Sequence, residues 1–289
     1  MKHAYLIMAH NEPEMLKRLL SRLDSCDSDF YVHLDKKSSM VPEEITSSAT
    51  RSKTVFIERK PIFWGGYSQI DCEMRLLEQA VQGNYDYYHL LTGVDLPLKT
   101  NEEIDQFFQQ NSGAEFISFD QAANETRDFT ARYDGYHFCL CYGGNNALLK
   151  SASLLINKIL KKVLRVANRF VRRSRKYPDL VFMKGSSYFD ITHPMASYVV
   201  AQKDLIAKVF RHTVCCDEVF LHTVAYNSPY KDRINVSETR FIDWSKHKNS
   251  PEILTMEHYD QLMHTDALFA RKFSSEHSAE LIEKLYGNE

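Results

Sequence analysis

The sequence lacks the short motifs by which several large enzyme classes are recognised. It contains no G-x-G-x-x-G, no Walker loop, no G-x-S-x-G and no H-E-x-x-H. It therefore has none of the phosphate-binding loops, nucleophile elbows or zinc-binding helices that these motifs encode. The formal net charge is only -2, whereas nucleic-acid-binding domains are usually strongly basic. These absences argue against a dehydrogenase, a P-loop enzyme, a serine hydrolase and a nucleic-acid-binding protein.

The chain also lacks a long apolar segment and a cysteine pattern typical of metal sites. No run approaches the roughly 18 apolar residues of a membrane-spanning helix, and the apolar start soon turns polar, as a first strand does and a secretory signal does not. The six cysteines include the neighbours Cys215 and Cys216 and a C-x-C at Cys139 and Cys141. Neither is a zinc or redox spacing. We therefore expect reduced structural thiols and a cytoplasmic location.

What the sequence does contain is an alternation of strand-like and helical segments. Helical patterns cover 15–23, 69–81 and 101–110, the last with Thr100 as its expected cap. Such alternation predicts an α/β fold whose sheet is largely parallel in its first half. With 289 residues and 44% hydrophobic content, the chain can bury a large core. The segments with the apolar and β-branched character of strands are 4–9, 30–34, 54–57, 86–92, 115–119 and 188–192.

Polar and aromatic side chains follow the first four of these predicted strands. His10, Asp35 and Asp95 come directly or almost directly after a strand, and Trp64 lies in the loop after the third. In open α/β sheets, ligands bind at the carboxyl ends of the strands. We therefore expect these four residues to converge on a ligand site.

A second candidate region runs from 184 to 228. A Gly185-Ser186-Ser187 loop enters the predicted strand 188–192, and the adjacent acids Asp217 and Glu218 open a helical pattern. Acids in a first helical turn are favoured by the helix dipole, so the pair is consistent with a simple cap. The other interpretation is a carboxylate at the mouth of a cleft, suited to taking a proton from a hydroxyl. The pattern alone leaves both open.

Taken in order, the motifs resemble those of a known family. The set AHNE, HLDKKS, FWGGYS, LLTGVDLPLKT, KGSSYFDIT, DEVFLHTVAYNS, ETRFIDWS and FARKF is similar to the core-2/I-branching β-1,6-N-acetylglucosaminyltransferases, a family that includes the peptide O-xylosyltransferases. The resemblance runs from about residue 3 to 273, with a gap at about 120–180, and suggests a bacterial-type member. It implies a GT-A type nucleotide-sugar fold, an inverting mechanism and a UDP-sugar donor. It also implies one domain over 1–289, with a nucleotide-binding half (1–120) and an acceptor and catalytic half (121–289).

The resemblance assigns roles to the charged residues of the second half. Glu218 matches the catalytic base, and a carboxylate within reach of the acceptor hydroxyl can serve as one. Arg240 and Lys272 match the basic residues that face the donor's diphosphate, where fixed cations can replace a metal. The alternative for either cation is a solvated surface charge. Asp120, Arg127 and Arg132 fall where the family places acceptor-binding residues.

For the donor, the resemblance places His10 and Asp35 against the uridine, although His10 could instead satisfy a turn and Asp35 cap a loop. Trp64 would form an aromatic wall, unless it is a core residue beside a tight turn. Gly185 and Ser186 would meet the sugar. Asp95 and these residues form the expected donor site.

We expect no metal and no cofactor, since the UDP-sugar is a substrate. Most GT-A enzymes hold a metal with Asp-x-Asp, but the loop after the fourth strand carries only Asp95, and a hard cation prefers several oxygen ligands. Asp27 and Asp29 do form an Asp-x-Asp, but they precede the second strand, at the wrong end of the sheet. A metal-dependent retaining transferase is the alternative, and it would be inactivated by a chelator.

The most unusual segment is 148–176. It holds ten lysine and arginine residues and no acid, and its apolar residues recur at helical spacing. This predicts a basic amphipathic helical insertion that lies on an anionic membrane surface, at the inner face of the membrane. A docked helix with a solvated basic face is the alternative.

The sequence thus predicts a glycosyltransferase with a UDP-sugar donor and an oligosaccharide or lipid-linked glycan acceptor. N-acetylglucosamine is the first choice of sugar, with xylose and galactose as alternatives. A non-catalytic carbohydrate-binding protein of the same fold is the alternative from another class.

Overall fold

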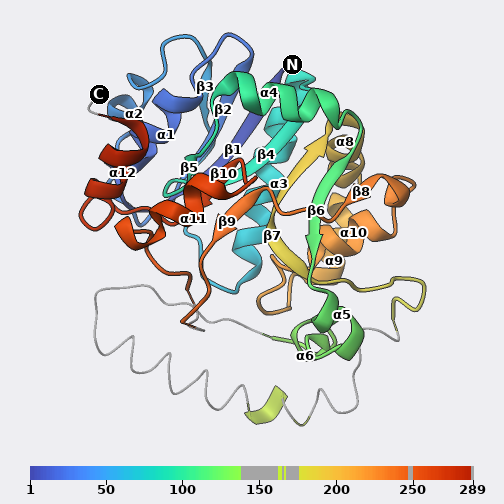
Figure 1. Cartoon of the computed structure of the whole chain (residues 1–289). Coiled ribbons are helices and arrows are strands. Elements are labelled where there is room, and N and C mark those ends of the chain that lie inside the picture. The colour runs from blue at the N-terminus through green and yellow to red at the C-terminus, as the bar shows by residue number, and fades with distance from the viewer. Residues whose placement is uncertain (138–161, 165, 167–175, 247–249, 288–289) are drawn as a thin grey trace.

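The computed structural model describes residues 1–137, 162–164, 166, 176–246 and 250–287 (Figure 1). All structural statements below concern these residues. The predicted basic insertion at 148–176 lies, but for a few positions, outside them.

A seven-stranded sheet forms the centre of the molecule, in the order β3-β2-β1-β4-β7-β6-β8 (Figure 1). The first four strands of the chain run parallel, as predicted, and β7 runs antiparallel to both of its neighbours. The strands are β1 (His3–Ala9), β2 (Ser28–Leu34), β3 (Thr54–Phe56), β4 (Tyr87–Thr92), β6 (Glu115–Phe119), β7 (Gly185–Thr192) and β8 (Ile234–Asn235).

Each face of the sheet carries its own hydrophobic core, because side chains alternate along a strand. Along β1, Ala4 and Leu6 belong to one cluster of buried residues, and Tyr5, Ile7 and Ala9 belong to the other. A strand buried on both faces needs a nearly continuous apolar run, which is why these segments stand out in the sequence. The α/β class is therefore confirmed.

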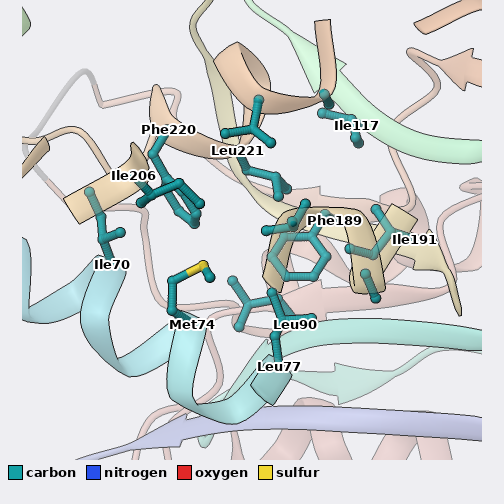
Figure 2. Packing of buried hydrophobic residues seen from close by; sticks show 14 of the residues in the cluster. Ile70, Met74, Leu77, Leu90, Ile117, Phe189, Ile191, Ile206, Phe220 and Leu221 are labelled. Atoms are coloured by element: carbon teal, nitrogen blue, oxygen red, sulfur yellow. The ribbon is translucent and has the colours of Figure 1, made fainter. Parts of the chain in front are cut away.

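Helix α3 (Tyr67–Ala80) contributes Ile70, Met74 and Leu77 to the first core (Figure 2). They lie close to Phe189 of β7 and Phe220 of α10 (Figure 2). Other elements that contribute to this core include η1 (Val81–Gly83), α8 (His193–Ala201), α9 (Lys203–Phe210) and α10 (Phe220–Tyr226).

The second core lies between the sheet and α1 (Pro13–Leu23), α4 (Asn101–Gln110), α12 (Ala279–Tyr286) and a three-stranded sheet. That smaller sheet has the order β5-β10-β9, formed by β5 (Leu96–Pro97), β10 (Phe269–Arg271) and β9 (Arg240–Ile242). The remaining elements are α2 (Pro42–Thr46), α5 (Gln121–Thr126), α6 (Thr130–Tyr133), η3 (Lys231–Arg233), η4 (Met256–His258) and α11 (Tyr259–His264).

The predicted first residues agree closely with the structure for α4 and α3 and less closely for α10. Thr100 caps α4 in a full capping box with Glu103, as its position predicts. Helix α3 begins at Tyr67, two residues before the predicted start. Helix α10 begins only at Phe220, and its N-cap position, Val219, has no side-chain cap. Asp217 and Glu218 thus lie in the turn before α10 and do not cap it.

Candidate active site

A cavity of about 940 Å³ opens at the carboxyl ends of the parallel strands. Its wall includes the residues that follow β1 and β4, from Ala9 to Glu12 and from Thr92 to Val94, together with Asp35 after β2. The opposite part of the wall comes from the 184–188 and 217–218 segments and from 271–274. The two regions that the sequence singled out therefore meet in one cavity, at the edge where such sheets bind ligands.

Glu218 lies in the cavity wall, half-exposed, between two cations. The Arg132 Nη1 donates a hydrogen bond of 2.6 Å to its Oε2, and the Lys184 Nζ lies 3.8 Å from the same oxygen. Lys184 also donates to the Asp120 carboxylate over 2.7 Å. These contacts hold the carboxylate of Glu218 in place, and the side chain remains accessible from the cavity.

The backbone of Gly185 lies in close contact with Glu218, Ser118 and His222. Its backbone nitrogen donates to the Glu218 carbonyl oxygen over 3.0 Å. A Cβ at this position would lie 1.8 Å from the Ser118 carbonyl oxygen and 2.5 Å from the His222 ring. Only glycine permits this approach. Gly185 and Ser186 both line the cavity, as expected.

Asp217 makes different contacts from its neighbour Glu218. Its Oδ2 accepts a hydrogen bond from the Ser187 hydroxyl over 3.2 Å and lies 3.4 Å from the Gln69 amide nitrogen. Burial raises the pKa of Asp217, and the charge of Glu218 adds to the shift. Of the two acids, Glu218 is the one whose carboxylate lies between two cations at the cavity wall.

At the β1 and β2 end, His10, Asp35 and Trp64 all line the cavity, as predicted. Asp35 is buried and accepts hydrogen bonds from the backbone nitrogens of Lys37 (2.8 Å) and Ile62 (3.2 Å). These contacts tie the loop after β2 to the loop after β3.

Arg240 is not among the cavity-lining residues. It is buried and paired with Asp190 on β7, and its guanidinium also donates to the carbonyl oxygens of Leu90 and Phe189. Burial alone would raise the pKa of Asp190, but Arg240, followed by His89, outweighs burial and holds it below its usual value. This arrangement joins β4, β7 and β9 and leaves Arg240 out of reach of a ligand in the cavity.

Two neighbouring cations of the described chain do line the cavity near β10, namely Arg271 and Lys272. Lys272 was predicted, and its Nζ donates to the Ser250 hydroxyl over 2.7 Å. The guanidinium of Arg271 lies 4.8 Å from the centre of the Tyr188 ring. Arg271 was not predicted, although it stands beside Lys272 in the same FARKF motif.

Asp95 supports Arg271 from behind the wall. It is fully buried and accepts hydrogen bonds from the Thr92 backbone nitrogen (2.9 Å) and hydroxyl (2.6 Å). Its Oδ1 lies 3.4 Å from Nε of Arg271. Asp95 is not among the lining residues, so it can position the arginine but does not itself face the cavity.

The three residues predicted to bind the acceptor differ from one another in their relation to the cavity. Asp120 lines the cavity and caps α5, and Arg132 reaches Glu218 as described. Arg127 is not a lining residue, because its guanidinium donates to the Phe182 carbonyl oxygen over 2.6 Å. The structure adds Lys184, the first residue of the KGSSYFDIT motif, for which no role was predicted.

Both tryptophans of the sequence line the cavity, and both are exposed, Trp64 by 74% and Trp244 by 49%. Tryptophan is usually largely buried. Exposed aromatic rings beside a cavity provide flat apolar surfaces that keep a polar edge, which suits contact with a sugar ring. Trp244 lies just after Arg240 in the ETRFIDWS motif, but no local signal showed that it faces the cavity.

Fold and cavity together define an α/β protein with a cavity at the strand ends, whose wall includes the Glu218 carboxylate and the neighbouring cations Arg271 and Lys272. The chain belongs to the Core-2/I-Branching enzyme family, whose family profile matches residues 3–263. The resemblance noted in the sequence is thereby confirmed.

Among curated proteins, the chain is similar to xylosyltransferases. It is 25% identical to xylosyltransferase 2 of Rattus norvegicus, over 99% of this chain and 34% of that protein. It is 23% identical to xylosyltransferase 1 of Canis lupus familiaris, over 99% of this chain and 31% of that protein. The chain thus spans about a third of the length of these relatives.

Among solved structures, apo mouse xyloside xylosyltransferase 1 matches with a TM-score of 0.42 and 11% identity, over 93% of this chain and 97% of that one.

In the part of the chain that the structure describes, no helix has the length and apolar character needed to cross a membrane.

Proposed function

We propose that this chain is an inverting glycosyltransferase that moves a sugar from a UDP-sugar to a glycan hydroxyl, with Glu218 as general base. N-acetylglucosamine is the first choice of sugar, with xylose and galactose as alternatives. The observation that carries the proposal is that one cavity combines an accessible carboxylate, Glu218, with an adjacent pair of cations, Arg271 and Lys272. Family membership supports it.

In this mechanism the acceptor hydroxyl binds beside Glu218, which takes its proton as the oxygen attacks the anomeric carbon of the donor. The bond from that carbon to the diphosphate breaks, and negative charge develops on UDP. Arg271 and Lys272 stabilise this charge, the arginine with a planar fork and the lysine as a point charge. His10, Asp35 and Trp64 hold the nucleoside end of the donor.

We further propose that the reaction needs no metal. Asp95, the acid after the fourth strand, is occupied by Thr92 and Arg271 and does not face the cavity. Within the described residues there is no group of three or more His, Cys, Asp or Glu side chains arranged to hold an ion. The two cations instead supply positive charge to the leaving group.

The acceptor that we propose is a hydroxyl of an oligosaccharide or of a lipid-linked glycan. Trp244, the exposed tryptophan of the cavity wall that is not assigned to the donor, suits contact with a sugar ring of the acceptor. The same feature also suits a carbohydrate-binding protein without catalysis, so the test has to separate the two.

The test is UDP release from a panel of UDP-sugars, with EDTA present. We expect release with one sugar at a rate unchanged by EDTA, because slow donor hydrolysis needs no acceptor. Rescue of an EDTA-inhibited enzyme by Mn²⁺ would overturn the metal-free mechanism. Binding of glycans without UDP binding or release would favour the carbohydrate-binding protein.

Trp64→Ala is expected to weaken UDP-sugar binding by about tenfold, since loss of an aromatic contact of 1–2 kcal/mol corresponds to that factor. The melting temperature should not change, because Trp64 is mostly exposed. Calorimetric titration with UDP-sugar and thermal unfolding measure the two effects. Met263→Ala, at an exposed residue of α11 outside the cavity, is the control. Equal binding by Trp64→Ala and wild type would remove Trp64 from the donor site.

A further inference from the structure

Helix α3 presents two polar side chains to the cavity, Gln69 and Glu73, one helical turn apart. Glu73 is the more unusual of the two. Its residue is only 2% exposed, yet it contributes to the cavity wall. Within the described residues, its Oε2 has no hydrogen-bond partner.

A buried carboxyl oxygen without a partner lowers the stability of the free protein. Most other buried residues of α3, such as Ile70, Met74 and Leu77, are apolar and belong to the first core. An apolar residue would suit packing better at this position. A polar ligand in the cavity supplies the missing partner and explains a carboxyl group here.

The surroundings of Glu73 also affect its protonation. Burial, followed by the charge of Asp217, raises its pKa well above the usual value. Both effects favour the uncharged carboxylic acid, which has one O–H to donate and a carbonyl oxygen to accept. Such a group pairs well with a neutral hydroxyl or amide and poorly with a phosphate.

The position of this carboxyl group relates it to the reaction. Its neighbour Asp217 lies 3.4 Å from the Gln69 amide nitrogen, accepts a hydrogen bond from Ser187 and precedes Glu218 in the chain. In the proposed function, the acceptor hydroxyl at Glu218 attacks the anomeric carbon, so the transferred sugar must lie beside Glu218. The cations proposed for the diphosphate, Arg271 and Lys272, come from another segment, at the end of β10. The α3 side of the cavity thus adjoins the sugar.

We propose that Glu73, together with Gln69, binds a hydroxyl or amide group of the transferred sugar and so determines which UDP-sugar the protein uses. This inference rests on the proposed function. It makes Glu73 a specificity-determining residue that touches the donor sugar and leaves the uridine and the diphosphate to other residues.

The test compares Glu73→Met and Glu73→Gln with wild type in calorimetric titrations with UDP and with UDP-N-acetylglucosamine, UDP-glucose, UDP-galactose and UDP-xylose. Methionine removes both hydrogen-bonding functions at similar size. We expect Glu73→Met to bind UDP normally and its preferred UDP-sugar at least about tenfold more weakly, and to lose its preference among the sugars. Glu73→Gln, whose amide can both donate and accept, should lose less.

Thermal unfolding adds a second measurement. Because the Oε2 of Glu73 is buried without a hydrogen-bond partner among the described residues, Glu73→Met should melt at the same or a higher temperature than wild type. Glu78→Gln is the matched control, since Glu78 belongs to the same helix but pairs with Lys203 and does not line the cavity. It should leave sugar preference unchanged.

The possible failures are distinguishable. If wild type binds UDP and both Glu73 variants keep its order of preference among the sugars, the inference is wrong and the proposed function stands. If the variants weaken UDP and every UDP-sugar by the same factor, Glu73 supports the fold and does not contact the sugar. If wild type binds neither UDP nor any UDP-sugar, the proposed function fails and the inference fails with it.

Discussion

Glu218→Gln is expected to lower the rate of sugar transfer by about 10² to 10⁴-fold, the usual contribution of a general base, while UDP binds as it does to wild type. The amide keeps the size of the side chain and can still accept a hydrogen bond from Arg132, but it cannot take a proton from the acceptor. The loss should therefore appear in kcat, measured with an acceptor and saturating donor, and not in the Kd for UDP.

Glu238→Gln provides the matched control for this prediction. Glu238 also lines the cavity, where it accepts a hydrogen bond from the Ser118 hydroxyl. If Glu238→Gln abolished transfer and Glu218→Gln did not, the base would be Glu238. If both variants kept full activity, an acid–base role for either carboxylate would be excluded.

Arg271→Ala and Lys272→Ala are each expected to weaken UDP binding by about tenfold or more, because a hydrogen bond to a charged group contributes about 1.5–3 kcal/mol. Uridine, which lacks the diphosphate, should bind to the variants as to wild type. The comparison of UDP with uridine by calorimetric titration therefore isolates the contact with phosphate. The effect on kcat should be larger still, since charge grows on the leaving group during the reaction.

Arg240→Met, in contrast, is expected to lower the stability of the protein and not to weaken UDP binding selectively. Removal of one partner of a buried ion pair leaves Asp190 uncompensated and costs about 3–5 kcal/mol of stability. We expect a lower melting temperature, with any loss of UDP binding matched by a loss of uridine binding. A selective loss of UDP binding in a fully folded Arg240→Met protein would place the diphosphate at Arg240 and contradict the proposed site.

Several features of the fold could be predicted because they depend on short-range order. The parallel strands are buried on both faces, so each appears as a continuous apolar run, and the start of α4 is determined by Thr100 and Glu103 within one turn. The order of the motifs along the chain identified the family. The same motifs placed His10, Asp35, Trp64, Glu218 and Lys272 at a site, and all five line one cavity.

Other features depend on contacts between distant segments, and no local pattern reports them. Asp217 and Glu218 looked like a possible helix cap, but α10 begins only at Phe220. Glu73 is a charged residue type among the mostly apolar buried positions of α3, and its significance appears only in the structure, where it lines the same cavity as Asp217 from far along the chain.

The sequence by itself determined the α/β class, the family and most of the residues at the strand ends, because periodicity, caps and motif order are properties of neighbouring residues. Only the tertiary structure decided which charges face the cavity. The sequence motifs predicted Arg240 and not Arg271 at the diphosphate, but Arg240 meets Asp190 on β7 inside the core, while Arg271 reaches the cavity beside Lys272. The physical reason is that a buried cation needs a buried partner, and the partner is supplied by a strand fifty positions away.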